Sequence, residues 1–233
     1  MTLLRTRYGP YRRGFNAACR SAGRAVRVFL CAVAAFPAVC GTAVAADEPV
    51  VVVFGDSLSA GYGVANADSF PSRLAAALDR LDRPVRMINA GVSGDTSAGG
   101  RARLDWMLGD APDMVIVELG ANDGLRGLDP ATTYDNLDAI LTRLDSEGIP
   151  VLLAGMLAPP NLGAEYGAAF NAVFPRLAAE HDVIFYPFFL DGVAARPALN
   201  QADGMHPNAE GVAAIVERIL PHVIEALERT ASR

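Results

Sequence analysis

The motif Gly55-Asp56-Ser57-Leu58-Ser59 follows directly on a run of apolar residues and contains the candidate nucleophile Ser57. Glycines at positions 55, 61 and 63 allow the backbone to turn sharply there. A serine at the start of a helix can act as a nucleophile beside a base, and the free helix amides can stabilise an oxyanion. The alternative is an ordinary N-cap serine. The loop has no lysine and no G-x-G-x-x-G spacing, which disfavours phosphate binding.

His206 is the histidine whose surroundings best fit a catalytic base. It lies in Asp203-Gly204-Met205-His206-Pro207, just before the last predicted helix, whereas His181 and His222 are explained as surface or capping residues. The three-residue separation allows the Asp203 carboxylate to fold back on one imidazole nitrogen, which leaves the other to take a proton from a serine. As half of a metal site, the pair would need further ligands that the sequence does not group nearby.

Two more loops carry groups that can bind a developing oxyanion. Asn122 follows a predicted strand, and its carboxamide can donate a hydrogen bond to such an oxygen. Gly94 lies in the loop after another strand, where its amide can approach closely. Turn chemistry explains each loop by itself. The motifs nevertheless end strands one, two, three and five of one predicted sheet, and this joint occurrence favours an active site.

Short apolar runs alternate with segments of helical periodicity. The predicted strands are Pro49–Phe54, Val85–Ala90, Met114–Leu119, Ile149–Ala154 and Val183–Pro187. Their continuous apolarity predicts a parallel sheet buried on both faces. Three predicted helices each have an apolar face: Phe70, Leu74, Leu78 and Leu81 in the first, which Ser69 can cap; Tyr134, Leu137, Leu141 and Leu144 in the second; and Phe170, Val173, Phe174 and Leu177 in the third. A last helix is predicted over Asn208–Arg229, with a kink at Pro221. We therefore predict one three-layer α/β/α domain with its ligand at the carboxyl ends of the strands.

Glu118 is unusual, because a carboxylate ends an otherwise apolar strand. Burying a charge is costly unless it finds partners. We expect this carboxylate to hold loop amides around the site.

The first 46 residues differ in charge from the rest of the chain. Residues 1–46 carry seven arginines and no acid, and residues 47–233 carry 13 arginines and 26 acids, so +7 and −13 add to the net charge of −6. The basic start, the apolar stretch Val28–Ala46 and its small final residues predict a signal peptide over 1–46 and a mature domain over 47–233. The alternative is an uncleaved membrane anchor, since about 19 apolar residues approach the roughly 20 that span a bilayer.

Composition excludes several classes of protein. The 233 residues are 52% hydrophobic and 20% charged, which excludes disorder and collagen-like repeats. All 20 basic residues are arginines, which excludes Schiff-base lysine chemistry. The acidic mature domain makes nucleic acid an unexpected partner. All three cysteines lie before residue 47, so the mature domain is expected to fold without disulfides.

The sequence resembles the SGNH (GDSL) hydrolases, whose four blocks are named for Ser, Gly, Asn and His. The blocks occur in order as Gly55–Tyr62, Ser93–Ser97, Gly120–Gly127 and Asp203–Pro207. Within the family the chain is most similar to the bacterial periplasmic multifunctional thioesterases, lysophospholipases and arylesterases. Ala121 stands where close relatives often have glycine, which affects only the path of that loop. The resemblance implies a flavodoxin-like, five-stranded parallel sheet.

The resemblance also implies a role for each motif. Ser57 would be the nucleophile, His206 the general base and later acid, and Asp203 the residue that orients the histidine. The amides of Ser57 and Gly94 and the Asn122 side chain would form the oxyanion hole. Acyl transfer would follow a ping-pong course, with no metal or organic cofactor.

Substrate contacts are expected in two loops. The resemblance implies a flap over Gly124–Asp129, with Leu125 and Leu128 as acyl-chain contacts. As a separate hypothesis, we expect the loop Leu157–Gly163, with Leu157 and Leu162, to form the other wall. The expected substrates are small-molecule or lipid acyl esters and thioesters. The alternatives are a carbohydrate O-acetyl esterase and a non-catalytic periplasmic binding protein of the same fold. We expect a periplasmic or secreted protein without a stable membrane anchor after cleavage, and the sequence does not determine the oligomeric state.

Overall fold

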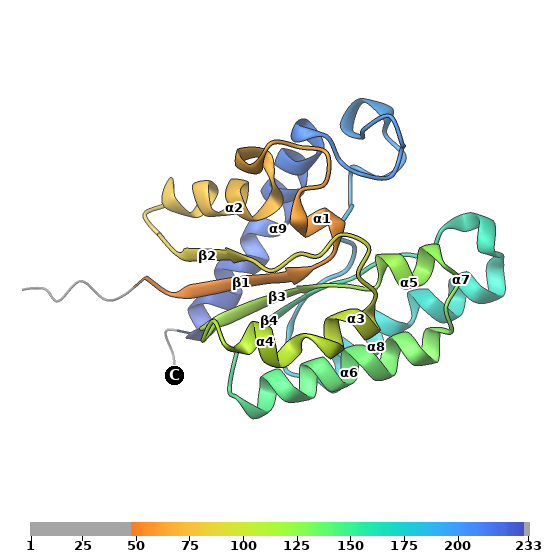
Figure 1. The fold of residues 1–233 in the computed structure, drawn as a ribbon, viewed down its shortest axis with the longest axis horizontal. Coiled ribbons are helices and arrows are strands. Elements are labelled where there is room, and N and C mark those ends of the chain that lie inside the picture. Colours follow the sequence, from red (N-terminus) through yellow and green to blue (C-terminus); the bar gives the residue numbers. More distant parts are fainter. Residues whose placement is uncertain (1–47, 231–233) are drawn as a thin grey trace, which may run out of the picture. The chain divides into compact units, whose positions relative to one another are not determined.

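The computed structural model describes residues 48–230 (Figure 1). Five strands form one parallel sheet in the order β2-β1-β3-β4-β5. They are β1 (Val50–Gly55), β2 (Arg86–Asn89), β3 (Met114–Glu118), β4 (Val151–Ala154) and β5 (Ile184–Tyr186). Each predicted run contains or overlaps one of these strands, so all five strand predictions are confirmed. The predicted signal peptide lies outside the described residues.

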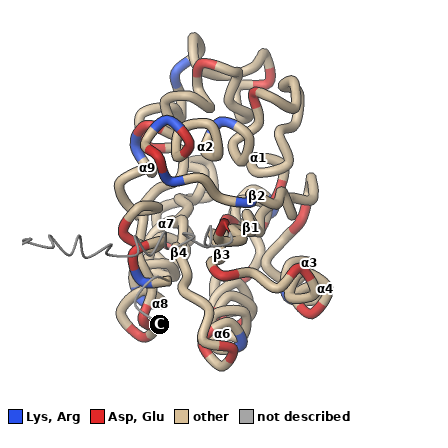
Figure 2. The backbone as a smooth tube through the Cα atoms, turned by 90° about the vertical axis from the view of Figure 1, so that its left-hand side faces the viewer, with Lys and Arg blue, Asp and Glu red and all other residues tan. Residues whose placement is uncertain are grey.

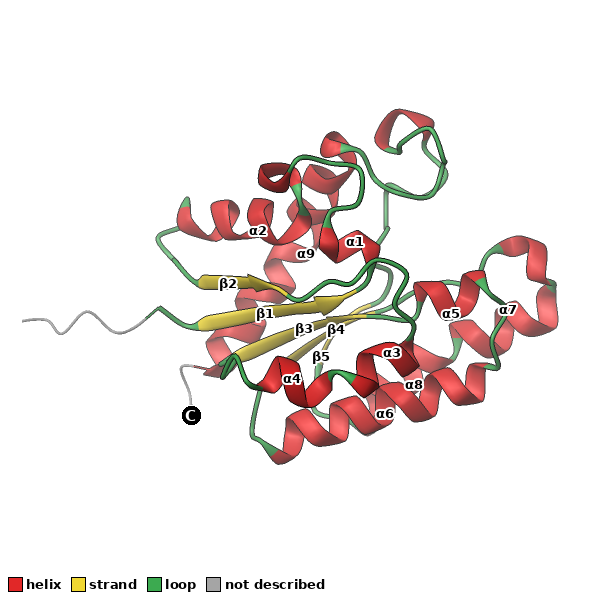
Figure 3. Cartoon of the chain, viewed as in Figure 1, coloured by secondary structure: helices red, strands yellow, loops and turns green. Residues whose placement is uncertain are grey.

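The helices form layers on both sides of the sheet. The α-helices are α1 (Ser57–Ala60), α2 (Phe70–Asp79), α3 (Ser97–Ala102), α4 (Leu104–Leu108), α5 (Ala121–Leu125), α6 (Pro130–Ser146), α7 (Ala164–Asn171), α8 (Val173–Glu180) and α9 (Ala209–Thr230). Short 3₁₀ helices lie at Asn66–Asp68, Pro160–Leu162 and Pro197–Leu199. α2 and α9 pack together on one face, and α3, α6 and α8 cover the other (Figure 3). The three-layer α/β/α prediction is therefore confirmed.

Burial follows position in the sheet. Every residue of the central strands β3 and β4 is buried, and β1 is buried from Val51 onward. β2 is an edge strand and none of its residues is buried, so the prediction of burial on both faces is wrong for this strand. The other edge strand, β5, keeps Ile184 and Tyr186 buried because α9 and α8 pack against it.

The second helix begins and ends differently from the prediction. Ser69 occupies the N-cap position of α2, but its hydroxyl donates to the Asn66 carbonyl at 2.8 Å instead of accepting a helix amide. α2 ends at Asp79, and Asp82 then turns the chain with φ of 55°. Leu81 therefore lies outside the helix and is 48% exposed, so its predicted place on the buried face is wrong.

One predicted helix is two helices in the structure. The stretch from Phe170 to Leu177 divides at Ala172 into α7 and α8. Pro175 gives the physical reason, because proline has no amide to bond to the carbonyl of Asn171 and its ring crowds that carbonyl. Phe170, Phe174 and Leu177 are nevertheless buried, so the predicted apolar face is correct.

The last helix fixes the end of the loop that contains His206. α9 continues as helix through Pro221. Its first turn is capped by Asn208, whose Oδ1 accepts the Gly211 amide at 2.9 Å.

No helix in the described part of the chain is both long and apolar enough to span a bilayer. Figure 2 shows basic and acidic residues interspersed over the helices and loops of residues 48–230.

Candidate active site

The structure joins three side chains from the two ends of the described chain. His206 Nε2 lies 3.0 Å from Ser57 Oγ, and His206 Nδ1 lies 2.6 Å from Asp203 Oδ2. Ser57 begins α1 at the carboxyl end of β1, and the other two residues lie in the loop before α9. Ser57 as a residue is partly exposed. This order of contacts is the one that proton transfer from a serine requires.

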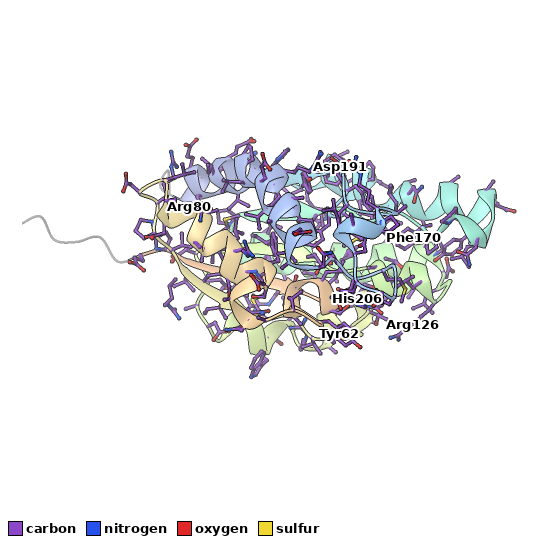
Figure 4. All side chains as sticks on the ribbon, turned by 90° about the horizontal axis from the view of Figure 1, so that it is seen from above. Tyr62, Arg80, Arg126, Phe170, Asp191 and His206 are labelled. Carbon is purple, nitrogen blue, oxygen red and sulfur yellow. The ribbon has the colours of Figure 1, made fainter. Side chains whose placement is uncertain are left out.

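The histidine loop is fastened to the loop after α1. The Gln201 amide donates to the His206 carbonyl at 2.8 Å, and Gln201 Nε2 donates to the Tyr62 carbonyl at 2.7 Å. The Tyr62 and His206 rings pack against each other, with 4.6 Å between their centroids (Figure 4). These contacts hold the imidazole next to the start of α1, and no sequence pattern predicted the ring contact.

Asp203 is held in its charged form by the same loop. Its Oδ1 accepts the amides of Met205 at 2.9 Å and His206 at 3.0 Å. These two backbone hydrogen bonds, with the His206 imidazole, lower the pKa of Asp203 to about 2. The carboxylate is therefore ionised at any pH near neutrality.

Asp56, and not Ser57, is the N-cap of α1. Asp56 Oδ1 accepts the Leu58 amide at 3.0 Å, which leaves the Ser57 hydroxyl free of any capping role. The N-cap interpretation of Ser57 is therefore wrong. The chain enters this turn through Gly55, where a Cβ atom would lie only 2.2 Å from Ser59 Oγ and 2.7 Å from the Glu118 carbonyl oxygen.

Asn122 lies at the same edge of the sheet, in the first turn of α5. Its side chain is partly exposed, and its Nδ2 donates to Asp56 Oδ2 at 3.0 Å. Gly94 lies on the neighbouring loop with φ of 85°, a conformation that favours glycine. Arg126 Nη2 donates to the Gly94 carbonyl at 2.8 Å. The structure thus places all three predicted oxyanion-hole residues in segments that follow the carboxyl ends of strands: Ser57 at the start of α1, Gly94 in a loop and Asn122 in α5.

Asp123 ties the loops of Gly94 and Asn122 together. This buried carboxylate accepts the Ser97 amide at 2.8 Å, the Ser97 hydroxyl, and the Thr133 hydroxyl at 3.2 Å. Ser97 begins α3, three residues after Gly94. Sequence reasoning did not single out Asp123, because its partners come from other elements.

Arg103 is a second tie that the sequence did not reveal. Its Nε donates to Asp95 Oδ2 at 2.6 Å, its Nη1 to the Ala90 carbonyl at 2.8 Å and its Nη2 to the Gly55 carbonyl at 2.9 Å. The guanidinium also lies 4.2 Å above the centre of the Phe54 ring. One side chain thereby joins the ends of β1 and β2 and the loop that carries Gly94.

Two buried carboxyl groups, those of Asp56 and Glu118, lie next to the segment that carries Ser57. Glu118 Oε2 accepts the Ser59 hydroxyl at 2.6 Å and the Asp56 amide at 3.3 Å, so the expectation that Glu118 holds a loop amide is confirmed. Burial, together with the charge of Asp56, raises the pKa of Glu118 well above its usual range. Burial likewise raises the pKa of Asp56 to about 6, against the opposing hydrogen bonds from Leu58 and Asn122. Burying the charged forms of Asp56 and Glu118 is therefore unfavourable, and their hydrogen bonds do not fully offset this cost.

The predicted substrate leucines lie in the segments that follow β3 and β4. Leu125 is 50%, Leu157 48% and Leu128 37% exposed, while Leu162 is half-buried. Leu162 Cδ2 lies 3.8 Å from where a Cβ of Gly127 would stand, so the two predicted walls approach each other. Exposed leucines at a sheet edge can bind an apolar chain.

The other two histidines, His181 and His222, contact Asp138 and Tyr186 and not Ser57. His181 Nε2 lies 2.8 Å from Asp138 Oδ1 at the C-terminus of α8, in agreement with the predicted helix-end position. His222 packs edge-on against Tyr186 at 5.1 Å, and its buried Nδ1 has no partner, so it is less exposed than a surface residue. Among residues 48–230, no three His, Cys, Asp or Glu side chains are grouped to hold a metal ion.

The chain is similar to several bacterial esterases. It is 40% identical to esterase TesA of Pseudomonas aeruginosa, covering 76% of this chain and 88% of that protein. It is 38% identical to an arylesterase of Vibrio mimicus, covering 81% and 94%. It is 41% identical to thioesterase 1/protease 1/lysophospholipase L1 of Escherichia coli strain K12, covering 71% and 79%.

Two solved esterase structures also resemble this chain in fold. The crystal structure of TesA matches with a TM-score of 0.73 at 39% identity, over 76% of this chain and 99% of that one. AlinE4, a SGNH-hydrolase family esterase, matches with a TM-score of 0.66 at 47% identity, over 78% and 98%. The model of the GDSL-like lipase/acylhydrolase family matches residues 53–214, a range that contains Ser57, Gly94, Asn122 and the Asp203–His206 pair. The chain therefore belongs to the GDSL-like lipase/acylhydrolase family, the SGNH hydrolases that its four sequence blocks predict.

Proposed function

We propose that this chain hydrolyses carboxylic esters and acyl thioesters through an acyl-enzyme on Ser57. The observation that carries the proposal is the 3.0 Å contact between Ser57 Oγ and His206 Nε2, with Asp203 on the other imidazole nitrogen. The relatives named esterase, arylesterase and thioesterase support the reaction class. The test is ester hydrolysis by the chain from Asp47 onward, measured beside Ser57→Ala.

The first half of the reaction transfers the acyl group to the enzyme. Ser57 Oγ attacks the carbonyl carbon while His206 Nε2 takes the hydroxyl proton. The carbonyl oxygen becomes an oxyanion, which accepts hydrogen bonds from the Asn122 side chain and the Gly94 and Ser57 amides. When the tetrahedral intermediate collapses, the bond to the leaving group breaks and His206 returns the proton to the departing alcohol or thiol.

The second half releases the acid. Water attacks the acyl-enzyme carbonyl while His206 takes one of its protons, and the proton passes to Ser57 Oγ as the acid leaves. Asp203 stays ionised throughout, because the loop amides and the imidazole hold its pKa near 2. Its charge stabilises the imidazolium that forms in both halves. The enzyme therefore returns to its starting state without a cofactor.

Leu125 is expected to contact the acyl chain of long substrates. Losing this contact in Leu125→Ala removes about 1–2 kcal/mol of apolar burial, so kcat/KM for octanoyl and longer p-nitrophenyl esters falls about 5- to 30-fold, while the acetyl ester is little affected. The measurement is kcat/KM for p-nitrophenyl esters from acetyl to palmitoyl.

The matched control for this prediction is Leu81→Ala. Leu81 is 48% exposed against 50% for Leu125, but it lies before β2, at the opposite end of the sheet. The control is expected to keep the wild-type profile. A wild-type profile that falls steeply beyond acetyl would instead favour a carbohydrate O-acetyl esterase, and equal losses on all esters in Leu125→Ala would contradict the contact.

Export accounts for the N-terminal segment. The proposal is that residues 1–46 direct the chain across the bacterial inner membrane and are removed, which leaves a periplasmic or secreted enzyme. Expression of the full chain in a bacterium is expected to give a periplasmic product. Its intact mass should be that of a chain that begins at Ala46 or Asp47. Recovery of the uncut chain in the membrane fraction would favour the anchor alternative.

A further inference from the structure

Asp56 is a fully buried carboxylate with both oxygens engaged. Its Oδ1 accepts the Leu58 amide at 3.0 Å, and its Oδ2 accepts Asn122 Nδ2, also at 3.0 Å. One contact lies within its own turn, and the other reaches across to α5. α1 and α5 lie next to the carboxyl ends of β1 and β3 (Figure 1). The side chain thus bridges the segments that carry the nucleophile and the carboxamide.

The second contact determines how the Asn122 amide is turned. A carboxylate can only accept hydrogen bonds, so the group that faces Asp56 must be the amide nitrogen and not the amide oxygen. Nδ2 carries two hydrogens, and Asp56 takes one of them. The other remains for an acceptor in the site, whereas a flipped amide would offer its oxygen and repel an oxyanion.

Glu118 holds the backbone of Asp56 through one of its two carboxylate oxygens. Its Oε2 accepts both the Asp56 amide and the Ser59 hydroxyl, while its buried Oε1 has no hydrogen-bond partner. Burying two neighbouring carboxyl groups disfavours folding, and such local costs in a fold are typical of functional sites. Capping alone does not explain the cost, since serine or asparagine caps a helix as well as aspartate does.

We infer that Asp56 is a positioning residue of the reaction, which sets the Asn122 carboxamide in the orientation that binds the oxyanion and is itself held by Glu118. The inference rests on the oxyanion role of Asn122 in the proposed function. It predicts different behaviour for the two carboxyl groups: Asp56 needs both oxygens as acceptors, and Glu118 needs one.

Conservative amides separate these two requirements. Asp56→Asn has one acceptor oxygen for two donors, so kcat is expected to fall about 10- to 100-fold at pH 8 with KM nearly unchanged, because an oxyanion contact acts in the transition state. Glu118→Gln keeps one acceptor oxygen and is expected to stay within about threefold of wild type. Asp113→Asn is the control, since Asp113 Oδ2 accepts the Val50 amide at 2.7 Å at the far end of the sheet, and it should leave kcat unchanged.

A double-mutant cycle tests whether Asp56 acts through Asn122. Asn122→Ala alone is expected to lower kcat about 10²–10³-fold. Adding Asp56→Asn to Asn122→Ala should then lower kcat by no more than about threefold further, because the group that Asp56 positions is gone. Losses that multiply in the double variant would overturn the inference, and so would an Asp56→Asn enzyme as fast as wild type.

Two further results keep the outcomes distinct. If Asn122→Ala is fully active, both the oxyanion role and this inference fail, whereas the acyl-enzyme is judged separately by Ser57→Ala. If Asp56→Asn does not fold, the wild-type Asn122 side-chain amide is observed by ¹⁵N NMR, with Asn122→Ala to assign it. Slow exchange of its hydrogens with solvent is expected, and exchange as fast as for an exposed asparagine would overturn the inference.

Discussion

Ser57→Ala is expected to lower kcat/KM for p-nitrophenyl esters by about 10⁴–10⁶-fold. The oxygen that attacks the carbonyl is absent in this variant, so His206 has no hydroxyl to deprotonate. The small remaining rate would come from the oxyanion hole acting on bound substrate and water. The measurement is initial rates with the acetyl to palmitoyl esters, with electrospray mass spectrometry of the wild type to detect the acyl adduct.

The control is Ser146→Ala. Ser146 Oγ donates to the Arg143 carbonyl at 2.7 Å near the end of α6, away from the site, so activity should be unchanged. Both variants should unfold at nearly the wild-type temperature, because neither hydroxyl is part of the core. A fully active Ser57→Ala enzyme would refute the acyl-enzyme, and wild-type protein inert on every ester would favour the binding-protein alternative.

Asp203→Asn is expected to lower kcat by about 10³–10⁴-fold. Asp203 accepts the hydrogen of His206 Nδ1, which leaves Nε2 without a hydrogen and able to take the Ser57 proton. An amide nitrogen at this position would donate to Nδ1, so the imidazole would carry its hydrogen on Nε2. That tautomer cannot act as the base. Steady-state rates across pH 5–9 provide the measurement.

The pH dependence gives an independent check on Asp203. Because its folded pKa is lowered to about 2 from the usual 3.8, the stabilisation from its charge is present above pH 4 and is lost only as the pH falls toward 2. Protonation of Asp203 should therefore not shape the rate profile between pH 5 and 9. Asp138→Asn is the matched control, since Asp138 lies 2.8 Å from a nitrogen of His181. His181 precedes the amino end of β5, whereas Ser57 follows the carboxyl end of β1. Full activity in Asp203→Asn would contradict its role.

The strands and the position of the site follow from local sequence signals. The run Val50–Phe54 is short, apolar at every position and mostly β-branched, which favours a strand covered on both faces. Parallel strands bring their carboxyl ends to one edge, so residues that follow different runs must meet there. This is why Ser57 and His206, far apart in the chain, could be predicted to lie together.

Local signals fail where packing against distant elements decides the outcome. The apolar pattern of Met87 and Ile88 predicts a buried strand, but the strand order leaves β2 at the edge with only partial cover. The apolar face from Phe170 to Leu177 predicts one helix, but Pro175 breaks its hydrogen bonding. Periodicity records which face is buried and not where a strand lies in the sheet.

The sequence by itself determined the fold class, the family and the residues of the proposed reaction, because these depend on residue types at short spacings. Only the tertiary structure decided how those residues are held. Asp56 and Asn122 are 66 positions apart, and Arg103 reaches Gly55 across 48 positions. No spacing rule marks such pairs, since a hydrogen bond between distant segments depends on how the loops pack after the sheet has formed.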